Sequence, residues 1–160
     1  MDLAKEKETY NGGKMVKVIC GMIGSGKTTY ALSNKKENDI LLDWDILADA
    51  LNTDNKVYIK DVQDMLLEYF YKKGFNIWYI TTKLGSNEKE ILNRMEDVEF
   101  IWINTNKKQC ENNIIKRNRN DEARCIEELK KCNYTIYQNY YTNKDIDYKI
   151  IDVFDSGERW

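Results

Sequence analysis

Hydrophobic residues in this chain gather in short runs that are separated by polar stretches of helical length. Four runs are rich in β-branched or aromatic residues and short enough to predict buried strands, over residues 15–20, 39–42, 75–82 and 98–103. A fifth strand is predicted over residues 148–154. The run at 75–82 is almost continuously apolar, so we expect it near the centre of a sheet that is covered on both faces.

Helical periodicity fills the intervals between these runs. Apolar residues recur every three or four positions from Asp61 until Gly74, which predicts an amphipathic helix. Other helices are predicted near Ile46, around residues 91–95 and over residues 107–116. A last long helix should bury one stripe, formed by Cys125, Leu129, Cys132, Ile136 and Tyr140.

Strands that alternate with helices indicate parallel pairing, right-handed crossovers and helices on both faces of the sheet. We therefore predict one three-layer α/β/α domain with a five-stranded parallel sheet over residues 14–160. Residues 1–13 are polar, lack any period and end in two glycines, which predicts a flexible arm in front of the domain.

The first predicted strand runs directly into GMIGSGKTT at residues 21–29. This matches the pattern G-x-x-x-x-G-K-[ST], and it lies between a strand and a helix start, as a phosphate-binding loop requires. Lys27 should reach the β and γ phosphates, and the Thr28 hydroxyl should take a Mg²⁺ position. The sequence thus predicts a site for ATP and Mg²⁺, with the phosphates held by Gly21, Gly24, Ser25, Gly26, Lys27, Thr28 and Thr29.

Two carboxylates follow the second predicted strand. Asp43 and Asp45 should lie at the carboxyl edge of the sheet, where ligands of doubly wound folds collect. One could accept a proton from an attacking hydroxyl while the other holds magnesium-bound water. We predict Asp43 as the base and as a metal ligand, with Asp45 as its partner; the alternative is that one of them only caps the helix near Ile46.

Arginine is unevenly distributed, because all five arginines lie at or after residue 94. Arg117 and Arg119 fall in a polar stretch between two predicted helices, where a lid over residues 117–124 could neutralise a phosphoryl group in transfer. A solvated basic turn is the alternative, and Arg124 is a further candidate. Residues 44–73 contain no arginine, which argues against bidentate recognition of an acceptor monophosphate.

Composition narrows the chemistry further. With 27 acidic and 25 basic residues the chain has no general positive field for nucleic acids, and with no histidine it has no imidazole catalysis. The four cysteines lack C-x-x-C spacing and no apolar leader opens the chain, so we expect a reduced, cytoplasmic protein. No stretch is long and apolar enough to predict a membrane span.

Three stretches together resemble small P-loop kinase-like proteins of tailed bacteriophages, often labelled AAA-family ATPases or ATP-binding proteins. They are GMIGSGKTTY at 21–30, DILLDWDILADAL at 39–51 and IWYITT at 77–82. More distantly, the chain resembles bacteriophage polynucleotide 5′-kinases and zeta-toxin kinases. The resemblance implies an adenylate-kinase-like P-loop NTPase with ATP on residues 24–29, a base at Asp43 or Asp45, and lid arginines at Arg117 and Arg119, acting in the host cytoplasm.

The chain departs from those enzymes in two places. No arginine follows the aspartates at residues 46–50, and Thr81 and Thr82 stand near the end of the third strand in place of an acid. We expect a kinase that phosphorylates a hydroxyl of a nucleotide, a nucleic-acid end or a sugar-containing small molecule, as a monomer or homodimer without a membrane partner. The alternative is an ATP-binding accessory protein of phage DNA metabolism or packaging without kinase activity.

Overall fold

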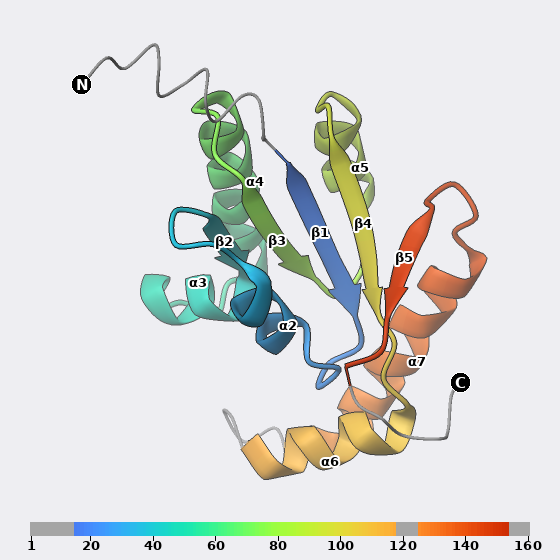
Figure 1. The fold of residues 1–160 in the computed structure, drawn as a ribbon. Coiled ribbons are helices and arrows are strands. Elements are labelled where there is room, and N and C mark those ends of the chain that lie inside the picture. The colour runs from blue at the N-terminus through green and yellow to red at the C-terminus, as the bar shows by residue number, and fades with distance from the viewer. Residues whose placement is uncertain (1–14, 118–124, 154–160) are drawn as a thin grey trace.

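The structure is a computed structural model that describes residues 15–117 and 125–153. The predicted arm at 1–13 and almost all of the predicted lid, including Arg119 and Arg124, lie outside these ranges. Within them the chain forms a parallel sheet of five strands in the order β2-β3-β1-β4-β5 (Figure 1). The strands are β1 (Val16–Gly21), β2 (Ile40–Asp43), β3 (Ile77–Thr81), β4 (Val98–Ile103) and β5 (Tyr148–Ile151).

The centre of the sheet is β1, which pairs with β3 on one side and β4 on the other. Val18 lies opposite Tyr79 of β3 and opposite Phe100 of β4. The strands are connected by helices, as parallel pairing requires. The helices are α2 (Lys27–Asn34), α3 (Trp44–Leu51), α4 (Lys56–Lys72), α5 (Ser86–Asn93), α6 (Lys107–Arg117) and α7 (Ile126–Thr142).

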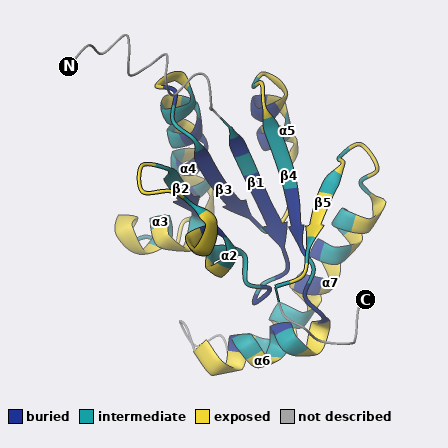
Figure 2. Ribbon diagram, viewed as in Figure 1, coloured by how far each residue is buried: buried dark blue, intermediate teal, exposed yellow. Residues whose placement is uncertain are grey.

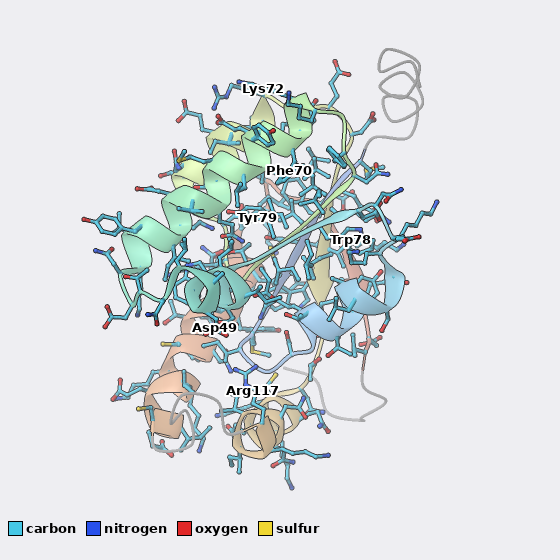
Figure 3. The ribbon with its side chains drawn as sticks, turned by 90° about the vertical axis from the view of Figure 1, so that its left-hand side faces the viewer. Asp49, Phe70, Lys72, Trp78, Tyr79 and Arg117 are labelled. Carbon is cyan, nitrogen blue, oxygen red and sulfur yellow. The ribbon has the colours of Figure 1, made fainter. Side chains whose placement is uncertain are left out.

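Helices cover the two faces of the sheet unequally. On one face, α4, α5 and α7 pack over a core that includes Val18, Leu67 and Tyr79 (Figures 1 and 2). On the other face, the short helix α2 packs over a smaller cluster that includes Ile19 and Trp78. Tyr79 and Trp78 are neighbours on β3 and point to opposite faces, toward α4 and α2 respectively (Figure 3).

The parallel sheet with helices on both faces confirms the predicted α/β class. All five residues of β3 are buried, as its continuous apolar run predicted.

The start of α4 was predicted too late, because the helix begins at Lys56 rather than at Asp61. Asn55 caps this end by accepting hydrogen bonds from the backbone N–H groups of Val57 and Tyr58. Residues 56–58 are exposed, whereas Ile59 is fully buried in the core. No helix of the described residues is long and apolar enough to cross a membrane.

The buried stripe predicted for the last helix is wrong at two positions. Cys125 and Cys132 are exposed. The buried residues of α7 are Asn133 and Ile136, so the predicted Ile136 is buried and Asn133 takes the place of Cys132. Asn133, a polar residue outside the predicted stripe, is only 3% exposed.

The four cysteines should therefore fall into two classes of reactivity. Burial raises the pKa of the thiols of Cys20 and Cys110 to about 12, which removes the reactive thiolate near neutral pH. At pH 8 we expect two thiols to react with Ellman's reagent in the folded protein and all four to react after unfolding. A Cys125→Ser/Cys132→Ser variant should show no fast reaction; a fast reaction in that variant would contradict the burial of the other two.

Candidate functional site

The loop of residues 22–26 leaves the carboxyl end of β1 and enters α2. The chain moves from β1 toward β2 at one edge of the sheet, whereas it moves from β4 toward β5 at the opposite edge. The loop thus lies beside the point where the direction of winding changes, which is where open α/β sheets bind ligands. Most of its residues are buried (Figure 2).

Glycine is required at two positions of this loop and is favoured at the end of β1, just before it. Gly24 and Gly26 have φ angles of +83° and +99°, which other residues rarely adopt. A Cβ on Gly24 would also lie 2.6 Å from the carbonyl oxygen of Cys110. Gly21 has a different reason, because a Cβ there would lie 2.6 Å from the Ser25 hydroxyl oxygen. The spacing of the motif is therefore matched by the steric needs of a tight turn.

Side chains from outside the loop hold three consecutive carbonyl groups. The donors come from the segment after β4, from α6 and from α7. The hydrogen bonds are Thr105 Oγ1 to the carbonyl of Ser25 (2.6 Å), Asn113 Nδ2 to that of Gly24 (2.9 Å) and Asn133 Nδ2 to that of Ile23 (3.1 Å). Each loop carbonyl thus has a fixed direction.

The direction of the carbonyls determines the direction of the N–H groups. In a trans peptide the C=O of one residue points opposite to the N–H of the next. With the carbonyls of residues 23–25 turned toward these side chains, the N–H groups of residues 24–26 point the other way. The Ser25 N–H donates to the carbonyl of Met22 (3.0 Å). The N–H groups of Gly24 and Gly26 and those of the first turn of α2, which have no partner within the helix, form a donor surface suited to an anion, whereas the Ser25 N–H is already used within the loop.

Lys27 lies folded over this loop. Its Nζ donates to the carbonyls of Gly21 (3.0 Å) and Met22 (2.8 Å). Burial lowers the pKa of Lys27 to about 8, although the nearby carboxylates of Asp45 and Asp43 act in the opposite direction. Ser25 is also fully buried here, and its hydroxyl has no hydrogen-bond partner within the described residues. Both groups could make further hydrogen bonds to a bound phosphate.

Thr28 and Asp43 are brought together, as the predicted metal site requires. The Thr28 hydroxyl donates to Asp43 Oδ2. Asp43 Oδ1 accepts the backbone N–H of Asp45 (2.9 Å), so Asp43 also caps α3. Asp43 is buried, whereas Asp45 is exposed in the first turn of α3. The two aspartates thus have different surroundings at the same edge of the sheet.

No three Cys, Asp or Glu residues of the described ranges lie close enough to form a metal site by themselves. The oxygens of Thr28 and Asp43 fit a hard cation such as Mg²⁺, which binds protein through one or two oxygens and completes its shell with water and phosphate. A cation at this place would therefore depend on a bound phosphate ligand.

Arg117 is the last residue of α6, which crosses below the loop (Figure 1). It is exposed and lies on the same side of the molecule as Asp49 of α3 (Figure 3). Its positive charge lowers the pKa of the Cys110 thiol, although burial has the larger effect and raises that pKa. Arg117 is therefore near the loop, while Arg119 is outside the described residues.

The end of β3 has no carboxylate, as the sequence indicated. The Thr81 hydroxyl donates to the carbonyl of Lys83 (3.0 Å), so it shapes the turn after the strand.

A residue that the sequence analysis did not single out connects the end of β3 to β2. Gln63 of α4 is fully buried and its Nε2 donates to the carbonyls of Leu42 (3.0 Å) and Ile80 (2.9 Å).

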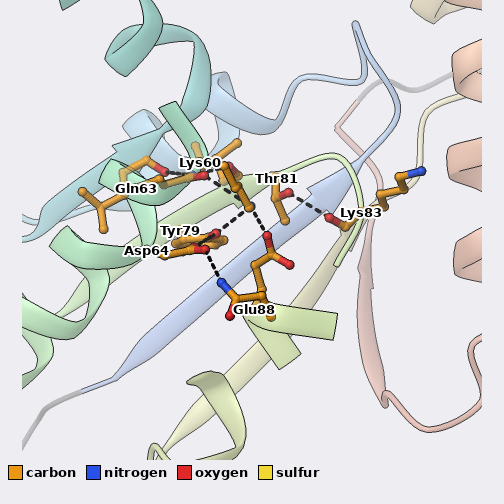
Figure 4. A network of polar contacts seen from close by, with 10 residues as sticks. Lys60, Gln63, Asp64, Tyr79, Thr81, Lys83 and Glu88 are labelled. Carbon is orange, nitrogen blue, oxygen red and sulfur yellow. Dashed lines mark hydrogen bonds and ion pairs between the residues drawn. The ribbon is translucent and has the colours of Figure 1, made fainter. Parts of the chain in front are cut away.

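A buried polar network extends from Gln63 between α4, α5 and β3 (Figure 4). The Tyr79 hydroxyl donates to Asp64 (2.6 Å) and accepts from Lys60 (2.7 Å). Lys60 also pairs with Glu88 (2.9 Å), and Asn87 donates to Asp64 (3.1 Å). Burial raises the pKa of Asp64, and its hydrogen bonds act against this effect. The network holds α4 against the sheet. In the sequence it is marked only by polar residues that lie beside the apolar face of a predicted helix.

Comparison with known proteins supports the fold and nothing finer. No protein-family model and no curated protein matches the sequence. Among solved structures, an uncharacterized protein from Eubacterium ventriosum ATCC 27560 is similar, with a TM-score of 0.58 and 18% sequence identity over 88% of each chain. At this identity the likeness shows a shared fold and says nothing of activity.

The depressed pKa of Lys27 predicts a specific pH dependence of stability. Between about pH 8 and the ordinary lysine value of 10.5, the unfolded chain binds more protons at this residue than the folded chain does. The free energy of unfolding should therefore rise with pH across this window relative to that of a Lys27→Met variant. Urea unfolding of both proteins from pH 7 to pH 10.5 measures the difference. A difference that is constant or falls with pH would contradict the burial of this amino group.

Proposed function

We propose that this protein is an ATP- and Mg²⁺-dependent phosphotransferase of the adenylate-kinase-like P-loop class. The observation that carries the proposal is the preformed donor surface at the end of β1, with Lys27 over it and the contact between Thr28 and Asp43 beside it. The sequence resemblance to bacteriophage kinase-like proteins agrees with this function. The acceptor would be a hydroxyl of a nucleotide, a nucleic-acid end or a sugar-containing small molecule.

The phosphates of the donor nucleotide would lie against the N–H groups of the loop and of the first turn of α2. These groups would donate hydrogen bonds to the phosphate oxygens, and the helix terminus adds partial positive charge. Lys27 Nζ would exchange its hydrogen bonds to the loop carbonyls for bonds to phosphate oxygens. Because its pKa of about 8 still leaves it mostly charged at neutral pH, it can stabilise the negative charge of the phosphates.

Thr28 and Asp43 would hold Mg²⁺, either directly or through water. The bound ion would neutralise charge on the phosphates and keep them in place. Both Asp43 oxygens already accept hydrogen bonds, from the Thr28 hydroxyl and from the N–H of Asp45. This arrangement supports a positioning role for Asp43 and makes it less suited to receive a proton from a substrate.

Asp45 is the better candidate for the general base, because it is exposed in the first turn of α3 and its charge acts on Lys27. In the reaction the acceptor oxygen forms a bond to the γ-phosphorus as its proton passes to Asp45. The bond from the γ-phosphorus to the bridging oxygen breaks, and its electron pair leaves with ADP. Arg117 and Arg119 would stabilise charge on the phosphoryl group in transfer.

One observation favours the alternative of an ATP-binding accessory protein. Lys60, a lysine of α4 that could recognise an acceptor phosphate, already pairs with Glu88 and with the Tyr79 hydroxyl. These contacts leave Lys60 less available to an anionic acceptor. This also supports a hydroxyl acceptor without a phosphate close to the reacting oxygen.

Transfer of radiolabel tests the proposal directly. The protein is incubated with γ-labelled ATP and Mg²⁺ against nucleosides, monophosphates, 5′-hydroxyl oligonucleotides and nucleotide-sugars. We expect label in one class of acceptor. Asp45→Asn should lower kcat by about a hundredfold or more with little change in ATP affinity, because a general base contributes this much. Asp43→Asn should instead weaken Mg²⁺-dependent ATP binding.

Asp49→Asn is the matched control, since Asp49 is an exposed carboxylate on the same helix. It should retain full activity. Tight ATP binding without transfer to any acceptor would favour the accessory function over the kinase. Failure of the wild-type protein to bind ATP would overturn both.

A further inference from the structure

We propose that Asn133 is a positioning residue for the phosphate-binding loop, and that it sets the affinity for phosphates without touching them. The inference rests on the proposed nucleotide binding. Asn133 belongs to α7 and lies 110 positions from Ile23 in the sequence, yet its side chain contacts the loop at this residue. None of the sequence motifs includes it.

The contact has two hydrogen bonds that join one side chain to one residue. Asn133 Oδ1 accepts the backbone N–H of Ile23 (2.7 Å), and Asn133 Nδ2 donates to the carbonyl of Ile23 (3.1 Å). The amide therefore fixes the peptide planes on both sides of Ile23. The second of these planes contains the N–H of Gly24, which it directs away from α7 and toward the donor surface of the loop.

This restraint acts next to a glycine, where no side chain limits the backbone conformation. Gly24 follows Ile23 and has a φ of +83°, and glycine loses more conformational freedom on ordering than any other residue. Without an external restraint the loop would have to lose this freedom when a phosphate binds, and the affinity would fall. Because Asn133 holds the peptide before any ligand binds, this conformational freedom is lost when the protein folds and not when a phosphate binds.

Asn133 is poorly explained as a packing residue. It is 3% exposed in a helix stripe whose next buried member, Ile136, packs in the hydrophobic core. A buried amide costs free energy unless both of its polar atoms are paired, and here both pair with the loop. Leucine would fill the same space without that cost, and aspartate would lack the donor.

The test compares Asn133→Leu with Ile136→Ala, a variant of the same helix with a similarly buried side chain. The probes are ATP and inorganic tripolyphosphate, each with Mg²⁺, and Kd is measured by calorimetry on protein shown to be folded by circular dichroism. We expect Asn133→Leu to raise Kd for both probes by about tenfold or more, since two buried backbone groups lose their partner. Ile136→Ala should lower the unfolding midpoint and leave Kd unchanged.

Hydrogen exchange without any ligand gives a second readout. The amide of Ile23, which loses its acceptor, should exchange faster in Asn133→Leu than in the wild type, and should be unaffected in Ile136→Ala. Should Asn133→Leu not fold, Asn133→Ser, which keeps a small polar group, is measured in the same way.

Unchanged Kd values in the Asn133 variant, with a loss of stability like that of Ile136→Ala, would overturn the inference and leave the proposed function intact. A larger Kd for ATP but not for tripolyphosphate would also overturn it, because the effect would then concern the base or sugar. Failure of the wild-type protein to bind either probe would overturn the proposed function, and the inference with it.

Discussion

The candidate site depends on the fixed direction of a few peptide groups. A loop that contains glycines can adopt many conformations, and any that turned carbonyl oxygens toward a bound anion would repel it. Here the side chains of Thr105, Asn113 and Asn133 donate hydrogen bonds to the carbonyl groups of residues 23–25, which therefore point toward α6 and α7. The N–H groups are thereby left to point in the opposite direction. The elements that follow β4 thus contribute to a site whose own residues lie at the other end of the sequence.

The sheet supplies the remaining geometry. Parallel strands end at the same edge, so β1 brings the loop and β2 brings Asp43 to one place. Gln63 then joins the ends of β2 and β3 through the carbonyls of Leu42 and Ile80. The contact between Thr28 and Asp43 is the point at which these two parts of the chain meet. This contact also gives the two aspartates different surroundings, because Asp43 is buried against Thr28 whereas Asp45 is exposed.

Much of this arrangement could be predicted from the sequence, because strands and a phosphate-binding loop have local signals. The five strands, the loop and the position of Asp43 were predicted in this way. Asn133 and Gln63 could not be, since each acts through backbone groups that are remote in sequence and neither has a local pattern. The error at Cys132 has the same origin, because apolar periodicity selects this cysteine, whereas the tertiary contact selects the neighbouring Asn133. Cys125 lies at the N-cap of α7, before the helix begins.

The central claim is that the loop is a preformed anion site, and backbone amide NMR measures it most directly. In a titration of the isotope-labelled protein with tripolyphosphate and Mg²⁺, the account predicts that the largest shift changes fall on the amides of Gly24, Gly26, Lys27 and Thr28. It also predicts that the amide of Ile23, which already donates to Asn133, changes less. Saturable changes centred on other parts of the protein, or no changes at these amides, would contradict the account.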